Sequence, residues 1–311
     1  MRIGYLVLAH ANPRLLKKAT ELLSSQHCAF FIHIDRKASI REFADITGDN
    51  IFFSEQRIPV NWGEFSQVEA TLLLVRQALS YSPGYDYLVF LQGSDYPLRS
   101  GRYIEGFLER NRGCEFMSLL KMPAPGYPLS KISMLRYPCD KPLRHFATRG
   151  LAKLGFAQRD YRKYLGGLDA YAGQTWWTLS RDACQYIVEF AESNPHVADY
   201  FRNTFTSDEM FFHTILGNSP ILPRLRRNLT YVDWTDRGNH PSMLNDEHLR
   251  MFEAQEKVWA DDEWGSGEVL FARKFSDDRL DLAARIDEMI RRKEEHGSSS
   301  LPSAARPSTP L

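Results

Sequence analysis

The chain has 311 residues, of which 43% are hydrophobic and 13% aromatic, enough for one large core or two closely packed lobes. Its 39 Lys and Arg balance its 39 Asp and Glu, so net charge does not point to nucleic acid or an anionic membrane as a partner. The four cysteines are far apart, unlike the close pairs of zinc sites and small disulfide scaffolds.

The N-terminal apolar segment, residues 3–8, is much shorter than the roughly 20 apolar residues of a membrane-spanning helix. Pro13, Lys17 and Lys18 follow it, in place of the small residues of a signal-peptide cleavage site. No other stretch reaches spanning length, so we expect a cytoplasmic protein without a transmembrane segment.

Strand and helix patterns alternate through the first 110 residues. Continuous apolar runs predict buried parallel strands, and apolar residues at helical spacing predict amphipathic helices. The predicted strands cover residues 3–8, 29–34, 51–53 and 87–91, and the predicted helices cover residues 13–23 and 65–79. This alternation predicts an α/β fold whose ligands bind beyond the carboxyl ends of the strands.

Polar residues, His10, Asp35 and Asp95, stand just beyond three of these strands. They are candidates for a nucleotide site. The alternative is that they only form turns or cap helices, as most aspartates at strand ends do. For Asp35, a role in the site and a role in the turn are evenly balanced.

The second half of the chain begins with a long stretch rich in Pro, Gly and basic residues, 121–165, and long loops of this kind are often functional. A strand is then predicted over 172–180, and helices over 182–193, 207–216 and 277–292. We predict a single domain over 1–296, built from the halves 1–110 and 111–296, and a disordered tail over 297–311.

Two carboxylates, Asp208 and Glu209, precede an apolar run. An inverting sugar transfer needs one carboxylate to take the proton of the acceptor hydroxyl, and Glu209 is the candidate. The alternative is a capping box, in which Thr206 and Glu209 cap the start of the helix, and the pattern alone favours it.

Adjacent tryptophans, Trp176 and Trp177, lie on the strand predicted over 172–180, so their rings point to opposite sides. An exposed indole beside a cleft would suit the apolar face of an acceptor sugar. The pattern alone favours the alternative, in which both rings lie in a large core.

Two cations, Arg273 and Lys274, stand between aromatic residues before the last predicted helix. A departing nucleoside diphosphate gains negative charge, which either a metal ion or fixed cations must neutralise. The chain has no Asp-x-Asp motif of metal-dependent transferases, which favours the two cations. It also lacks the phosphate loop, the Gly-x-Gly-x-x-Gly motif, the serine-hydrolase elbow and the His-Glu-x-x-His motif.

Seven segments resemble, in order, motifs of the core-2/I-branching β-1,6-N-acetylglucosaminyltransferase family, glycosyltransferase family 14. This family also includes peptide O-xylosyltransferases and plant β-glucuronosyltransferases. The segments are His-Ile-Asp-Arg-Lys at 33–37, Trp-Gly at 62–63, Leu-Gln-Gly-Ser-Asp-Tyr-Pro at 91–97, 173–180, Ser-Asp-Glu at 207–209, His-Pro at 240–241 and Phe-Ala-Arg-Lys-Phe at 271–275.

The resemblance implies a GT-A-type nucleotide-diphosphosugar transferase fold, with a mixed, mostly parallel central sheet flanked by helices. Residues 1–110 would bind the nucleotide, and residues 111–296 the acceptor and the diphosphate. It further implies an inverting enzyme that needs no metal or other cofactor. The donor would be a UDP-sugar carrying GlcNAc, xylose or glucuronate, and the acceptor a glycan or lipid-linked glycan.

Residue roles follow from the same motifs. Glu209 would be the general base. The donor nucleotide would be bound by His10, Asp35, Trp62, Gly63, Asp95, Arg273 and Lys274, and the acceptor by Trp176, Trp177 and Asp208. Family members also place an arginine on the diphosphate, and Arg237 and Arg227 are both candidates here.

Eukaryotic relatives carry a Golgi anchor and disulfides. Their absence here suggests a bacterial-type enzyme, free in the cytoplasm or peripheral at the inner membrane. Two other readings stay open: an inactive glycan- or nucleotide-binding module, and a metal-dependent enzyme with Asp35, Asp95 and Asp208 as ligands.

Overall fold

A seven-stranded mixed sheet forms the centre of the protein, in a computed structural model that describes residues 1–139, 143, 146, 148, 150, 157–236 and 240–299. The strand order is β10-β6-β9-β4-β1-β2-β3. Strand β9 is antiparallel to both neighbours, and the other four adjacent pairs are parallel. The strands are β1 Ile3–Ala9, β2 Cys28–Ile34, β3 Ile51–Phe53, β4 Tyr87–Gln92, β6 Glu115–Met117, β9 Trp177–Ser180 and β10 Leu225–Arg226.

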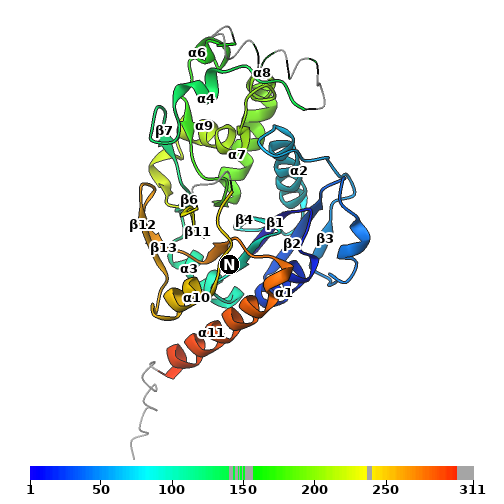
Figure 1. Ribbon diagram of the computed structural model, residues 1–311, viewed down its shortest axis with the longest axis vertical. Coiled ribbons are helices and arrows are strands. Elements are labelled where there is room, and N and C mark those ends of the chain that lie inside the picture. Colours follow the sequence, from blue (N-terminus) through cyan, green and yellow to red (C-terminus); the bar gives the residue numbers. More distant parts are fainter. Residues whose placement is uncertain are drawn as a thin grey trace, which may run out of the picture.

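Helices cover both faces of this sheet (Figure 1). Because successive strand residues point to opposite sides, Leu6 and Phe31 pack in one core and Val7 and Ile32 in another. The first core is closed by α2 Ser66–Ser80, α7 Arg181–Ser193, α8 Pro195–Phe201 and α9 Phe211–Gly217, and the second by α1 Pro13–Leu23 and α3 Gly101–Arg110. The predicted α/β fold with a mostly parallel central sheet flanked by helices is confirmed.

A second sheet joins distant parts of the chain. Its order is β11-β14-β5, with β11 Thr230–Val232, β14 Phe271–Arg273 and β5 Asp95–Pro97. The antiparallel pairing of β14 with β5 sets Arg273 opposite Asp95. The strand-end candidate Asp95 and the predicted diphosphate contact Arg273 are therefore neighbours.

The C-terminal segment packs against the start of the chain. Helix α11, Leu280–Ser299, crosses the molecule at the end opposite α8 (Figure 1), and its Leu282 and Ile286 share a core with Leu15 of α1. Asp277 accepts hydrogen bonds from the amides of Arg14 and Leu15, at 3.2 and 2.7 Å. These bonds satisfy free amides of the first turn of α1 and fix the segment that follows Lys274.

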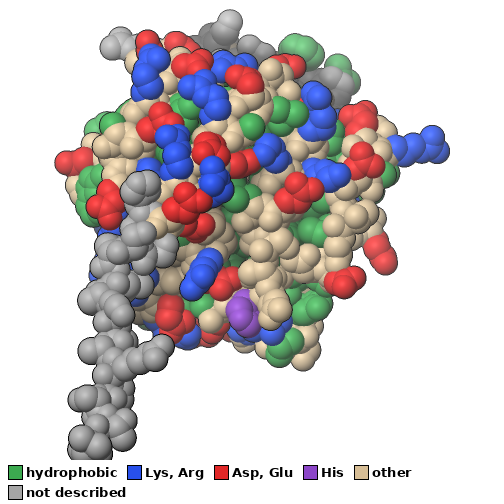
Figure 2. Space-filling view, turned by 90° about the horizontal axis from the view of Figure 1, so that it is seen from below, with side chains coloured by type: hydrophobic (Ala, Val, Ile, Leu, Met, Phe, Trp, Pro, Cys, Tyr) green, Lys and Arg blue, Asp and Glu red, His purple; other side chains and the backbone are tan. Residues whose placement is uncertain are grey.

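The remaining elements are short or peripheral. They are η1 Ile40–Phe43, β7 Leu120–Lys121, α4 Leu129–Ser133, α6 Tyr161–Tyr164, β8 Tyr171–Ala172, η2 Ser207–Glu209, η3 Leu222–Arg224, α10 Asp246–Glu253, β12 Trp259–Asp262, β13 Gly265–Glu268 and η4 Asp277–Arg279. On the face seen from below, acidic and basic side chains are interspersed (Figure 2). None of the helices in the described part is long and apolar enough to cross a bilayer.

Three predicted elements differ from the structure. The strand expected over 172–180 is interrupted, so Trp176 lies outside β9. The helix expected over 207–216 is split into η2 and α9, because Met210 has φ −132° and ψ −33°. The helix expected over 277–292 is η4 followed by α11, which extends to Ser299, and residues 300–311 of the predicted tail lie outside the described residues.

Candidate active site

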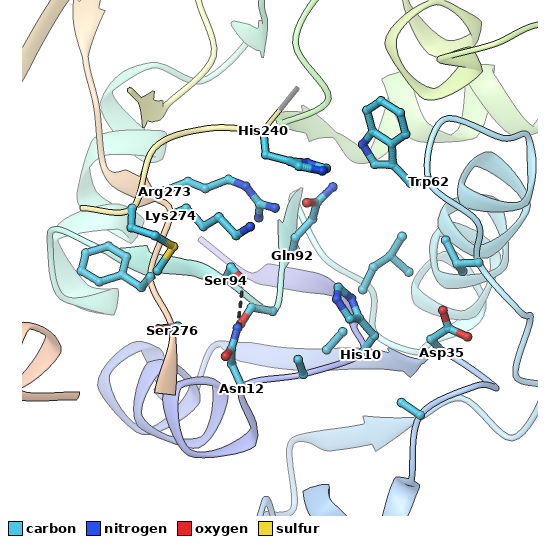
Figure 3. A pocket seen from close by; sticks show the side chains of 18 of the residues that line it. His10, Asn12, Asp35, Trp62, Gln92, Ser94, His240, Arg273, Lys274 and Ser276 are labelled. Carbon is cyan, nitrogen blue, oxygen red and sulfur yellow. Dashed lines mark hydrogen bonds between the residues drawn. The ribbon is translucent and has the colours of Figure 1, made fainter. Parts of the chain in front are cut away.

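A cavity of about 1150 Å³ opens beyond the carboxyl ends of β1, β2 and β4 (Figure 3). Its wall combines the loop after β1, the end of β2, the loop before α2, the turn after β4, the segment around residue 240 and the residues after β14. Polar and aromatic side chains on this wall include His10, Asn12, Asp35, Trp62, Gln67, Gln92, Ser94, His240, Arg273, Lys274 and Ser276. The cavity lies where the α/β order predicted a ligand site.

Asp35 is fixed at one end of the cavity. Its Oδ1 accepts a hydrogen bond from the amide of Lys37 at 2.8 Å, and its Oδ2 lies 3.6 Å from Lys37 Nζ. The same ammonium binds the carbonyl of Val60 and the side chain of Asn61, at 2.5 and 2.9 Å. Asp35 therefore forms an Asx-type turn and also lines the cavity, so the two roles weighed for it are compatible.

His10 lines the cavity together with Asp35 and three cations, Lys37, Arg273 and Lys274. Burial lowers the pKa of His10, and the positive charges of Arg273, Lys274 and Lys37 lower it further, against the opposing effect of Asp35. The imidazole is therefore predominantly neutral at pH 7. Arg273 and Lys274 line the same cavity, so two cations are available there for an anionic ligand.

A buried ion pair holds Arg273 at the other end of the cavity. Arg273 Nη1 donates to Asp95 Oδ1 at 2.7 Å, and the Asp95 side chain has no exposed surface. The indole Nε1 of Trp176 and the amide of Gln92 donate to Asp95 Oδ2, at 2.8 and 2.7 Å. The Arg273 guanidinium also lies over the Trp176 ring, 5.3 Å from its centroid.

These contacts bear on two predictions. Asp95 and Trp176 do not line the cavity, and both are buried, with 5% and 6% of their surface exposed. The structure thus gives both residues a role in orienting Arg273. A direct contact of Asp95 with nucleotide, or of Trp176 with acceptor, stays a prediction.

Lys274 projects into the cavity next to Arg273 (Figure 3). Within the described ranges its ammonium has no hydrogen-bond or ion-pair partner, and burial, followed by the charge of Arg273, lowers its pKa. Its carbonyl accepts from the amide of Leu244 at 2.9 Å, which fixes the backbone. The ammonium is thus partly desolvated, has no partner among the described residues and lies beside a second cation.

Asn12 ties three segments of the cation end together. Its Nδ2 donates to Ser94 Oγ at 2.8 Å (Figure 3), and its Oδ1 accepts from the amide of Asp277 at 3.2 Å. Asn12 also has the left-handed φ of 62° that asparagine tolerates better than most residues. Sequence reasoning missed this residue, although an Asn-Pro pair after a predicted strand signals a helix start.

The structure describes only one of the two arginine candidates for the diphosphate contact. Arg227 is buried and paired with Asp262 at 2.7 Å, outside the cavity wall, so it is the wrong candidate for a diphosphate contact. Arg237 lies outside the described residues. Arg279 was not predicted, but it lines the cavity and pairs with Asp281.

Glu209 lies in a carboxylate pair. Asp208 Oδ2 accepts hydrogen bonds from Gln67 Nε2 and Thr175 Oγ1, both at 3.0 Å, and Gln67 also lines the cavity. Burial, followed by the charge of Asp208, raises the pKa of Glu209 to about 7, while Lys131 opposes the rise. A carboxylate with such a pKa is well matched to general base catalysis near neutral pH.

The capping-box alternative is not formed. Thr206 makes no side-chain cap bond, and its hydroxyl oxygen is buried without a hydrogen-bond partner in the described part. Thr206 has φ 52°, and its amide donates to the carbonyl of Gly63 at 2.8 Å. Asp208 is buried in this turn, where it accepts hydrogen bonds from Gln67 and Thr175. A contact of Asp208 with the acceptor stays a prediction.

Trp62 and Gly63 connect the cavity to the Glu209 segment. The Trp62 ring is 56% exposed and packs edge-on against Phe205 and His240, each with centroids 5.3 Å away (Figure 3 shows His240). Gly63 has φ 69°, and a Cβ there would meet the Phe205 ring at 2.5 Å, so glycine is required.

Trp177 belongs to the core. It is 2% exposed and stacks on Phe90 with ring centroids 5.4 Å apart. Strand β9 is central in the sheet and covered on both faces, so the predicted acceptor contact of Trp177 is wrong.

No three His, Cys, Asp or Glu side chains within the described ranges form a group able to hold a metal ion. Asp35, Asp95 and Asp208 occupy separate places, each with its own hydrogen-bond donors. A shared ligand set of these three residues is therefore wrong.

Comparisons with known proteins agree with the motifs. The family model described as "Core-2/I-Branching enzyme" matches residues 3–256. Xylosyltransferase 2 of Rattus norvegicus is 26% identical over 246 residues, covering 75% of this chain and 27% of that protein. Xylosyltransferase 1 of Rattus norvegicus is 22% identical over 243 residues, covering 75% and 28%.

The chain thus spans about a quarter of the length of these curated relatives. Among solved structures, apo mouse Xyloside xylosyltransferase 1 is similar with a TM-score of 0.38 and 11% identity, over 87% of this chain and 97% of that one. The family match covers most of the chain and six of the seven motifs. The seventh motif, at 271–275, lies beyond the matched residues. The chain therefore belongs to the Core-2/I-Branching enzyme family.

Proposed function

We propose that the protein transfers a sugar from a UDP-sugar to a hydroxyl group of a glycan or lipid-linked glycan, with inversion and without a metal ion. The observation that carries the proposal is Lys274, an ammonium that lines the cavity beside Arg273 and has no partner in the described part of the chain. Family membership supports the reaction class.

In the proposed reaction, Glu209 accepts the proton of the acceptor hydroxyl as its oxygen attacks the anomeric carbon. The bond between that carbon and the diphosphate oxygen breaks on the opposite side, and UDP leaves with the electron pair. Lys274 and Arg273 neutralise the charge that develops on the diphosphate. Asp35 and Trp62 line the wall where the nucleoside would bind.

Donor candidates are UDP-xylose, UDP-GlcNAc and UDP-glucuronate. The two relatives named xylosyltransferases make UDP-xylose the first donor to test. We propose that the enzyme acts in the cytoplasm or at the inner membrane surface.

A thermal-shift screen with EDTA present tests donor and metal need together. A ligand at a hundred times its dissociation constant adds about 2.7 kcal/mol of stability. UDP and one UDP-sugar should raise Tm, and GDP and CDP should not. Release of UDP from that UDP-sugar, with water taking the place of the acceptor hydroxyl, should continue in EDTA. Stabilisation or turnover that requires manganese would contradict the proposal, and UDP binding without any release would favour an inactive binding module.

A further inference from the structure

We propose that Lys131 is a positioning residue for Glu209, whose ammonium holds the Glu209 carboxylate in its ionised, proton-accepting form. This inference rests on the proposed function, because it assumes that Glu209 is the general base. Lys131 belongs to α4, within the long Pro- and Gly-rich stretch, and outside all seven family-like segments.

The geometry places the ammonium against the carboxylate. Lys131 Nζ lies 3.6 Å from Glu209 Oε2, and it also lies over the Tyr127 ring, 4.4 Å from the centroid. The Tyr127 hydroxyl is within hydrogen-bond reach of Glu209 and 3.3 Å from the carbonyl of Gly173. The Gly173 amide in turn donates to the Glu209 carbonyl at 2.9 Å. Side chain and backbone of Glu209 are thus held from one side.

The charges around Glu209 explain why a cation is needed there. Asp208 is the adjacent carboxylate on the same turn, and it is buried with only neutral hydrogen-bond donors on its Oδ2. Tyr127 faces Glu209 from the loop before α4, and Glu263 acts on Tyr127 from the β12–β13 turn. Burial and Asp208 thus favour a protonated Glu209, and Lys131 is the cation that opposes them.

The size of the effect of Lys131 on the Glu209 pKa depends on how exposed the two side chains are. An opposite charge within about 4–6 Å lowers a carboxyl pKa by roughly 1–3 units. Both side chains are partly exposed, 34% for Lys131 and 26% for Glu209, so solvent screens the pair and the lower end applies.

The test compares Lys131→Met, which keeps most of the side-chain length, with Lys131→Arg, which keeps the charge. The Glu209 carboxyl is titrated by ¹³C NMR in protein labelled at glutamate, with Glu209→Gln identifying the signal. The wild-type midpoint should lie at about 7. Lys131→Met should raise it by about one pH unit, and Lys131→Arg should restore it.

The matched control is Lys121→Met. Lys121 forms an exposed ion pair with Asp169 near the same stretch and should leave the midpoint unchanged. The pH profile of UDP release gives a second readout. In Lys131→Met the acid limb of this profile should shift about one pH unit towards higher pH. The value of kcat/KM should then fall about tenfold at pH 6 and return to the wild-type value at pH 9.

An unchanged midpoint in Lys131→Met, or a lower rate at every pH without a shift, would overturn the inference. The proposed function would then stand, provided that Glu209→Gln still abolishes UDP release. Full activity of Glu209→Gln would instead remove Glu209 as the base, and with it the proposed mechanism.

Discussion

Asp95 and Arg273, 178 residues apart in the sequence, form a buried ion pair with 2.7 Å between Oδ1 and Nη1. The register of β5 against β14 sets them opposite each other, and Trp176 donates to the second carboxylate oxygen. The cation that faces the cavity is thus oriented by groups that never reach it.

Asp95→Asn tests this relationship. It leaves a largely buried guanidinium without its carboxylate, so unfolding free energy should fall by about 3 kcal/mol. UDP affinity should fall about tenfold, an order-of-magnitude estimate for a misplaced Arg273. Urea denaturation and calorimetric UDP binding measure the two effects.

The control is Trp176→Phe, which removes only one donor to Asp95 and should cost about 1–2 kcal/mol of stability. Wild-type UDP affinity in Asp95→Asn would show that Arg273 does not depend on Asp95.

Lys274→Met should weaken UDP binding and lower turnover by roughly a hundredfold, the usual cost of losing one preorganised charge at a developing anion. Stability should not fall, because the ammonium has no partner among the described residues and burial disfavours its charge. Lys17→Met, on the exposed face of α1, is the control. Unchanged UDP affinity in Lys274→Met would remove this residue from the diphosphate site.

Gly173→Ala should disturb Glu209 through the backbone. A Cβ at Gly173 would collide with the carbonyl of Ser118 and the ring of His213, which overpacks the core at a cost of about 3 kcal/mol. Gly126→Ala is the control, because it has φ 74° but open space around it, and should cost only about 1 kcal/mol. Urea denaturation midpoints compare the stabilities of the two variants. An equal loss of stability in Gly173→Ala and Gly126→Ala would contradict the close packing at Gly173.

The raised pKa of Glu209 predicts a pH-dependent stability difference. The pKa is about 7 in the folded protein and about 4.5 ordinarily, so the folded state binds this proton more tightly. That contribution is present below pH 4.5 and is lost as pH rises through 7. At pH 8, Glu209→Gln should be more stable than wild type by up to about 3 kcal/mol, since each pKa unit is worth about 1.36 kcal/mol.

At pH 4.5 the difference should largely vanish. Urea denaturation at both pH values measures it. A constant difference would mean that the Glu209 carboxylate is not strained by burial and by Asp208.

The sequence predicted the first half of the fold well, because its strands are continuous apolar runs buried on both faces. Predicted helix 13–23 coincides with α1, and 65–79 differs from α2 by one residue at each end. Helix α3 went unpredicted, although Ser100 caps it by accepting from the amide of Tyr103.

The site was harder to predict, because strand ends show which residues reach an edge but not which partner each one meets. Asp95 and Lys274 were both predicted to contact the nucleotide. Only the β5–β14 register shows that Asp95 accepts a hydrogen bond from Arg273. Lys131 and Tyr127 come from an aperiodic stretch, and their contact with Glu209 depends on tertiary packing that no local pattern records.

The most direct test of the proposed mechanism is UDP release by Glu209→Gln, measured in EDTA beside UDP affinity. Loss of a general base should slow release at least about a hundredfold while UDP binds as in wild type. Glu189→Gln, an exposed carboxylate on α7, controls for the substitution. Release at nearly the wild-type rate by Glu209→Gln would contradict the assignment of Glu209 as the group that activates the acceptor.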